Sequence, residues 1–253
     1  MSETTLIDRA VIRISGEEAR PFLQGLVTQD VLTLADGEAR WAGLLTAQGK
    51  ALFDFFIWAH AGDILIDCEA TQADALVRRL SLYRLRRKVD IARDDTLAVH
   101  WSRDTAGKPT DPRLPDIGQR WIAPAASMDE GRADAQHAAV YHAHRLSLGV
   151  TEGVAELGSD QTLWLEANAR ELHGVDFRKG CYIGQENTAR MHYRSKVNRR
   201  LVAVPLEMAD AKRQRLALPE LGLSIELRRI EDMDGLDLPP WLASAIAAAP
   251  MGS

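Results

Sequence analysis

The pattern of hydrophobic and polar positions predicts short strands mixed with helices. Alternating or short apolar runs predict strands at residues 10–14, 41–45, 51–58, 63–68 and 97–101. Apolar residues at helical spacing predict helices over 71–88 and 129–148. A Gln-Gly-Lys turn at 48–50 joins two of the strands. Hairpin-like strand pairs among helices indicate an α+β fold rather than a parallel α/β sheet.

A short helix over residues 17–26 is expected after the first strand. Ser15 is followed three residues later by Glu18, which is the spacing of a capping box. In such a box the two side chains satisfy backbone N–H groups at the start of the helix. Pro21 would fall near the first turn, where proline is tolerated.

The chain changes character near its end. Strands are predicted at 201–206 and 223–227, and an alanine-rich helix follows Pro239 and Pro240. Only about fifty residues remain after position 201, and few of them have a strand pattern. This region is therefore expected to form a small structure.

Composition narrows the classes of protein to consider. The 253 residues are 46% hydrophobic and 26% charged, as in globular proteins, and the net charge is −5. Because the chain is acidic overall, no net positive potential attracts it to nucleic acid or to a membrane surface. Neither is expected as a partner. The basic run 84–88 is the local exception: an anion site is conceivable there, but a solvated helix end is favoured.

Two cysteines, Cys68 and Cys181, are too few for a disulfide scaffold and fit a reducing compartment. They are also too few to hold an iron–sulfur cluster with four thiolates, and no metal site is expected. Residues 1–5 are polar and lack a targeting pattern. No apolar run approaches the ~20 residues of a membrane helix. We therefore expect a soluble cytoplasmic protein.

Residues 178–186, Arg-Lys-Gly-Cys-Tyr-Ile-Gly-Gln-Glu, carry the densest chemistry in the chain. Glycines on both sides of Cys181 suggest a tight backbone path or close approach of other groups. Lys179 could favour the thiolate of Cys181 by its charge, or bind an anion. A buried structural cysteine in a turn is the plainer alternative, but the polar neighbours favour a functional site.

This segment resembles the signature of the YgfZ family, Lys-Gly-Cys-Tyr-x-Gly-Gln-Glu. Three further stretches agree with the family in order, at residues 22–30, 44–55 and 174–177. Proteins of this family bind tetrahydrofolate, are related to the aminomethyltransferase of the glycine cleavage system, and assist iron–sulfur cluster assembly or repair. The resemblance extends to about residue 201.

The resemblance implies an aminomethyltransferase-like folate-binding fold. Residues 1–200 would form the folate-binding α+β region, as two intertwined subdomains, and residues 201–253 a shortened β-barrel region. Tetrahydrofolate would be the ligand, in a central cleft, and iron–sulfur clients or assembly proteins the partners. The candidate site comprises Cys181 and Lys179 for thiol chemistry, and Asp54, Tyr182, Gln185, Glu186 and Arg190 for folate binding.

Asp54 is the candidate that separates two functions. The related aminomethyltransferases have two adjacent acids in the similar strand, whereas this chain has Phe53 before Asp54. The missing acid favours a non-catalytic or weakly catalytic folate-binding assembly factor over the alternative, a folate-dependent one-carbon (aminomethyl) transferase or demethylase. A third hypothesis, a thiol hydrolase, would pair Cys181 with His173 or His192.

Overall fold

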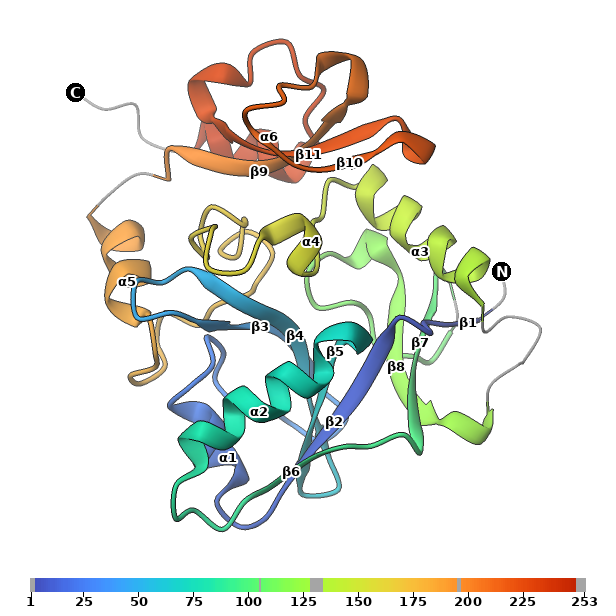
Figure 1. The fold of residues 1–253 in the computed structure, drawn as a ribbon, viewed down its shortest axis with the longest axis vertical. Helices are drawn as coiled ribbons and strands as arrows, with labels where there is room; N and C mark the ends of the chain where they lie inside the picture. The colour runs from blue at the N-terminus through green and yellow to red at the C-terminus, as the bar shows by residue number, and fades with distance from the viewer. Residues whose placement is uncertain (1–2, 105, 128–133, 195–196, 249–253) are drawn as a thin grey trace.

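The structure is a computed structural model, and it describes residues 3–104, 106–127, 134–194 and 197–248. The strands form three antiparallel sheets, and the first strand, β1, pairs in the sheet that is otherwise formed after the five-stranded one (Figure 1). The predicted α+β class is confirmed. None of the helices in the described ranges combines the length and the apolar character needed to cross a bilayer.

The largest sheet has five strands in the order β3-β4-β5-β2-β6. Their bounds are β2 Arg9–Ser15, β3 Ala39–Leu45, β4 Ala51–His60, β5 Asp63–Glu69 and β6 Asp90–Arg93. Helices α1 (Ala19–Gln24) and α2 (Ala73–Arg84, preceded by the 3-10 turn Ala70–Gln72) pack against it. The predicted hairpin at 48–50 joins β3 to β4.

The core of this sheet explains why β4 is apolar on both faces. Phe55 and Ile57 lie in the cluster beneath α1 and α2, whereas Phe56 and Trp58 lie in the cluster on the opposite side. Successive side chains of a strand point to opposite faces. A strand buried on both faces therefore has a continuous apolar run, which Asp54 interrupts.

The second sheet has the order β1-β7-β8, with β1 Thr4–Thr5, β7 Leu97–Ser102 and β8 Gln119–Pro124. Short 3-10 turns lie at Pro115–Ile117 and Ala125–Ser127, and helix α3 spans Ala135–Ser147. The segment that follows contains the short helix α4 (Val154–Leu157) and then the helix α5 (Gln185–Tyr193).

The third sheet, from the last fifth of the chain, has the order β10-β11-β9. It comprises β9 Arg199–Pro205, β10 Gln214–Leu218 and β11 Leu223–Arg229, with 3-10 turns at Leu206–Met208, Pro219–Leu221 and Ile230–Asp232 and the final helix α6 at Pro240–Ala247. Strand β10 was not predicted. Within the described residues the sheet is open, as a shortened barrel region would be. The division at residue 200 stays a prediction.

Three predicted helices differ from the structure at their ends. Ser15 is the last residue of β2, and Glu18 makes no capping bond to α1; its carboxylate instead accepts the backbone N–H of Lys88 at 2.7 Å. The helix predicted over 71–88 ends at Arg84, because Leu85 adopts φ 50° and cannot continue it. Of the helix predicted over 129–148, residues 129–133 lie outside the described residues.

Candidate functional site

The signature segment forms a loop that leads into α5, and Gly184 makes the junction possible. Gly184 has φ 82° and precedes the first residue of the helix. A Cβ at this position would lie 2.5 Å from the carbonyl oxygen of Thr46. Only glycine satisfies both the positive φ and the close approach. Gly180, on the other side of Cys181, has open space around it and no positive φ.

Helix α5 is also tied to the hairpin between β3 and β4. Asn187 donates from Nδ2 to the carbonyl oxygen of Gln48 at 2.9 Å. A Cβ on Gly49 would lie 3.2 Å from the carbonyl oxygen of Gly184. The strand–turn–strand stretch and the signature, which both carry the family resemblance, are therefore in direct contact.

Lys179 connects the signature to the chain that leaves α1. Its side chain is 7% exposed, and Nζ donates to the backbone carbonyls of Gln24, Val27 and Gln29 at 2.8, 2.5 and 2.8 Å. Burial lowers the pKa of this ammonium to about 8. Three acceptors match the three N–H bonds of a charged lysine. These contacts give Lys179 a structural task, and its activation of Cys181 stays a prediction.

The segment after α1 is held from a second direction. Thr28 donates from Oγ1 to the carbonyl oxygen of Gly174 at 2.7 Å and accepts the N–H of Gly43 at 2.9 Å. The Gln29 amide donates to the carbonyl oxygen of His173. Hence the third stretch of the resemblance, around residue 174, packs on the first. All four similar stretches converge around one loop.

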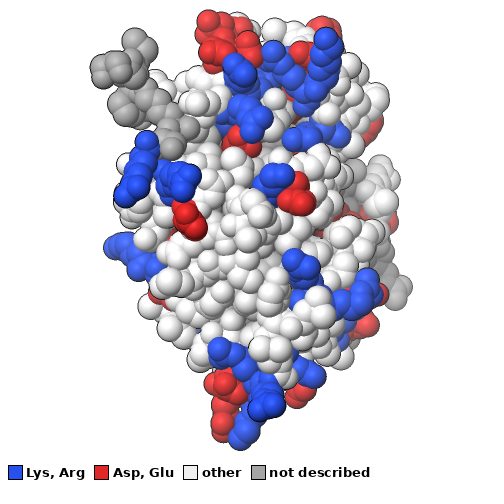
Figure 2. All heavy atoms as spheres, turned by 60° about the vertical axis from the view of Figure 1, so that its left-hand side comes forward, with Lys and Arg blue, Asp and Glu red and all other residues white. Residues whose placement is uncertain are grey.

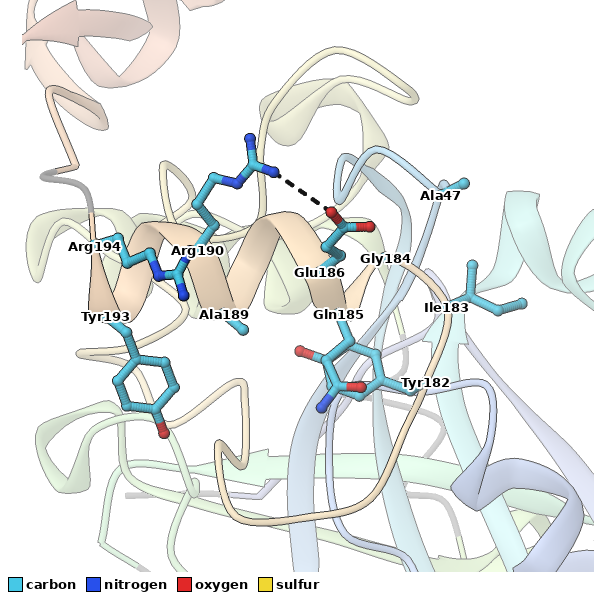
Figure 3. A pocket seen from close by; sticks show the side chains of 10 residues that line it. All are labelled: Ala47, Tyr182, Ile183, Gly184, Gln185, Glu186, Ala189, Arg190, Tyr193 and Arg194. Carbon is cyan, nitrogen blue, oxygen red and sulfur yellow. Dashed lines mark hydrogen bonds and ion pairs between the residues drawn. The ribbon is translucent and has the colours of Figure 1, made fainter.

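A pocket of about 760 Å³ opens beside this loop and along α5. Four of the five predicted folate-binding residues line it: Tyr182, Gln185, Glu186 and Arg190. Ala47, Ile183, Tyr193 and Arg194 are further lining residues that the sequence analysis did not single out (Figure 3). The helical spacing of positions 186, 190, 193 and 194 could have indicated the last two.

The pocket combines aromatic rings, an amide, a carboxylate and two guanidinium groups. Arg190 and Glu186 are joined by a long ion pair of 3.4 Å at positions i and i+4, and both side chains are exposed (Figure 3). Such a solvated pair contributes little to stability. Glu186 and Arg190 can therefore release each other and bind a ligand instead at a small cost in free energy. Arg194 adds a second cation to the pocket.

The two cysteines have opposite surroundings. Cys181 is exposed in the signature loop, whereas Cys68 is buried at 2% exposure, as predicted for a small core residue. Burial raises the pKa of the Cys68 thiol to about 12. The chemistry expected of a thiol is thus restricted to Cys181. No hydrogen bond among the described residues joins it to His173 or to His192, whose ring stacks on Phe177 at 3.6 Å.

Asp54 is buried and does not line the signature pocket. Its carboxyl accepts the indole N–H of Trp41 at 3.2 Å and the backbone N–H of Gly153 at 3.0 Å. Burial, with the nearby negative charges of Glu152 and Glu69, raises its pKa from 3.8 to about 7. Its predicted role as a folate ligand stays a prediction, although its hydrogen bonds are made to the protein itself.

The region beside Asp54 contains a network of buried charges that the sequence analysis missed. The carboxylate of Glu152 accepts hydrogen bonds from Arg113 at 2.6 Å, from Arg9 at 3.2 Å and from the hydroxyl of Tyr141 at 2.7 Å. Arg113 and Arg120 lie over the ring of Phe56, at 4.6 and 4.2 Å from its centroid. Asp67 and Asp111 supply further counter-charges. These residues connect the first two sheets, and two of them, Arg9 and Glu152, also line a separate pocket of about 310 Å³.

No group of three His, Cys, Asp or Glu residues in the described part of the chain is arranged to hold a metal ion. The pocket is built on the loop where the four similar stretches meet, and the exposed Cys181 lies in the same loop.

The fold is that of the aminomethyltransferases. The solved structure of the glycine cleavage system aminomethyltransferase T from Bartonella henselae superposes with a TM-score of 0.57 over 80% of this chain and 65% of its own, at 15% sequence identity. This likeness confirms the predicted fold class. No protein-family model matches the chain.

The sequence comparison identifies nearer relatives. The chain is 34% identical, over 79% of its length, to the iron–sulfur cluster assembly factor IBA57 homolog, mitochondrial, of Mycosarcoma maydis. It is 33% identical, over 78% of its length, to the mitochondrial iron–sulfur cluster assembly factor IBA57 of Homo sapiens. The chain is thus a homologue of these assembly factors, and its resemblance to the YgfZ family is confirmed.

Two facts qualify the comparison. The chain spans 56% of the Mycosarcoma maydis protein and 64% of the human one. The names of these relatives place them in mitochondria, which contradicts the cytoplasmic location expected here. That expectation rested on the two cysteines, the polar residues 1–5 and the lack of a long apolar run, and it was wrong.

Proposed function

We propose that this protein is a folate-binding accessory factor that supports the assembly or repair of iron–sulfur clusters. The observation that carries the proposal is its homology to proteins named iron–sulfur cluster assembly factors, at 33–34% identity over more than three quarters of the chain. The signature segment that suggested this function from the sequence is also the segment on which the pocket is built.

The pocket residues suit the chemistry of tetrahydrofolate. The volume of the pocket, about 760 Å³, falls within the ~300–1,000 Å³ usual for small-molecule sites. Gln185 and Glu186 offer the donors and acceptors that a pterin ring requires, and Tyr182 and Tyr193 offer apolar faces. Arg190 and Arg194 would hold the carboxylates of the glutamate tail. When bound, a reduced folate supplies a carrier for one-carbon units.

Cys181 would face the iron–sulfur partner proteins. It is the exposed thiol of the chain, and a thiolate is both a nucleophile and an iron ligand. One thiol cannot hold a cluster alone, so partner proteins would supply the remaining ligands. The one-carbon transferase alternative depends on Asp54, whose carboxyl is committed to Trp41 and Gly153. We therefore do not propose it.

Two measurements test the proposal. Calorimetric titration with tetrahydrofolate should show saturable binding that Arg190→Ala weakens about tenfold. Arg178→Ala is the matched control, since Arg178 is exposed on the same loop but does not line the pocket. Absence of binding at high folate concentration would remove folate from the proposal.

The second measurement separates the accessory role from catalysis. Iron–sulfur enzyme activities are assayed in cells that lack their own factor and express variants of this chain. An accessory factor should lose function with Cys181→Ala and keep most of it with Asp54→Asn. The reverse order, with the greater loss at Asp54, would favour the transferase.

A further inference from the structure

Helix α2 borders a second concave surface, which shares no residue with the signature pocket. A groove of about 640 Å³ lies between this helix and the start of β4. Its apolar lining comprises Leu52, Phe53, Val77, Leu82 and Ala75, and Arg78 and Arg79 are its cations, with Ser81 and Ser159 completing it. The proposed function does not use this surface, although Phe53 and Val77 also pack against the core beneath α2.

One face of helix α2 lines the groove. Residues 75, 78, 79 and 82 follow the i, i+3, i+4, i+7 rule for one helix face. The residues that α2 buries against the sheet are Ala73, Leu76 and Leu80. The positions 75, 78, 79 and 82 are therefore distinct from those that hold the helix in the fold, and Val77 borders both faces.

Two leucines at the end of this helix are largely exposed. Leu82 is 68% exposed and Leu85 is 85% exposed. Leu85 also has φ 50°, a conformation that costs energy for any residue except glycine. The Leu85 side chain buries little surface within the chain, so it is available to contact a partner.

The charge of the same segment is opposite to that of the whole chain. Residues 75–89 contain no acidic side chain but six basic ones, Arg78, Arg79, Arg84, Arg86, Arg87 and Lys88. Among the described residues, only Arg87 of these has an ion pair, with Glu18 at 3.8 Å. Figure 2 shows a broad uncharged face bordered by both basic and acidic side chains.

We infer that the groove beside α2 binds an acidic amphipathic segment of a partner protein, whose apolar side chains enter the groove while its carboxylates meet the arginines. Charge complementarity selects an acidic occupant. The recessed floor at Leu52 and Phe53, both half-buried, accepts inserted side chains. A flat anionic lipid surface would contact only the protruding leucines and leave that floor empty.

The test uses a fluorescein-labelled helical peptide of leucine and glutamate, about 15 residues long, with leucine at i, i+3, i+4 and i+7. Fluorescence anisotropy should show saturable binding to the full chain. Leu82→Glu should raise the Kd at least about tenfold, because it removes apolar contact and adds a repelling charge. Arg78→Glu should raise it several-fold.

The controls decide between occupants. Leu32→Glu changes a leucine that is 55% exposed outside the groove, and it should leave the Kd unchanged. Circular dichroism checks that each variant is folded. Equal binding of a leucine–lysine peptide, or binding that Leu82→Glu does not affect, overturns the inference. So does binding to phosphatidylglycerol vesicles without binding to the peptide, which would assign the surface to lipid.

Discussion

The signature loop and the buried charge network contain similar charged residues in opposite surroundings. Around the loop, Glu186 and Arg190 form a solvated pair that can open to a ligand. Around Phe56, Glu152, Arg113 and Arg120 are 0–5% exposed, and every charge is matched by another. The comparison teaches that a charged cluster indicates a binding site only where its charges are accessible. Buried and ion-paired with one another, the same groups hold sheets together.

The largest effect should come from unbalancing the network. Glu152→Gln removes one negative charge that Arg9 and Arg113 share. Breaking one member of a buried ion pair leaves an uncompensated charge and costs roughly 3–5 kcal/mol of the free energy of unfolding. Urea denaturation measures it. Glu186→Gln is the control on the solvated side, and it should change stability by less than about 0.5 kcal/mol. If both substitutions lowered the free energy of unfolding equally, the contrast between the buried network and the solvated pair would be wrong.

A smaller loss is expected at the anchor of the signature loop. Lys179→Met keeps the apolar stem but removes the donor from three buried backbone carbonyls. Leaving such acceptors unpaired should cost about 2–3 kcal/mol. Hydrogen exchange of the amides at 26–29 should also become faster, because the segment after α1 loses its tether. Arg178→Met, at the exposed neighbouring position, is the matched control.

Asp54 provides a test by pH. Its pKa is about 7 in the folded protein against an ordinary 3.8, so between these values the folded chain binds a proton that the unfolded chain has lost. Stability therefore falls as pH rises through this window and levels off above it. Over pH 5.5 to 8 the fall should approach roughly 2 kcal/mol.

The readout is the slope of the melting temperature against pH, with Asp54→Asn compared to the unmodified chain. Asparagine does not ionise, so the variant should lack this part of the decline. Its absolute stability is not the readout, because an amide can satisfy only one of the two N–H donors that face Asp54. Identical slopes for the two proteins would show that Asp54 is ionised throughout.

The two regions also differ in how far the sequence predicts them. Four of the five strands of the first sheet follow from local apolar runs, and four residues of the pocket lie within nine positions of one another, so a compact motif indicates them. The network joins Arg9, Arg113 and Glu152, which are separated by 39 to 143 positions. No local pattern marks such partners, and the strands β1, β6, β8 and β10 were missed for the same reason. Their pairing is decided by neighbours distant in the chain.

The smallest structural effect and the clearest chemical one should be at Cys181. Cys181→Ser should leave the free energy of unfolding within about 0.5 kcal/mol, because the thiol is exposed. With Ellman's reagent the native protein should release one equivalent rapidly, and a second only on unfolding, because Cys68 is buried and its pKa is about 12. Cys181→Ser should abolish the rapid equivalent and leave the slow one. If Cys68 reacted as fast as Cys181, the core beneath α2 would be open to solvent, and the contrast between a solvated site and a closed interior would fail at that point.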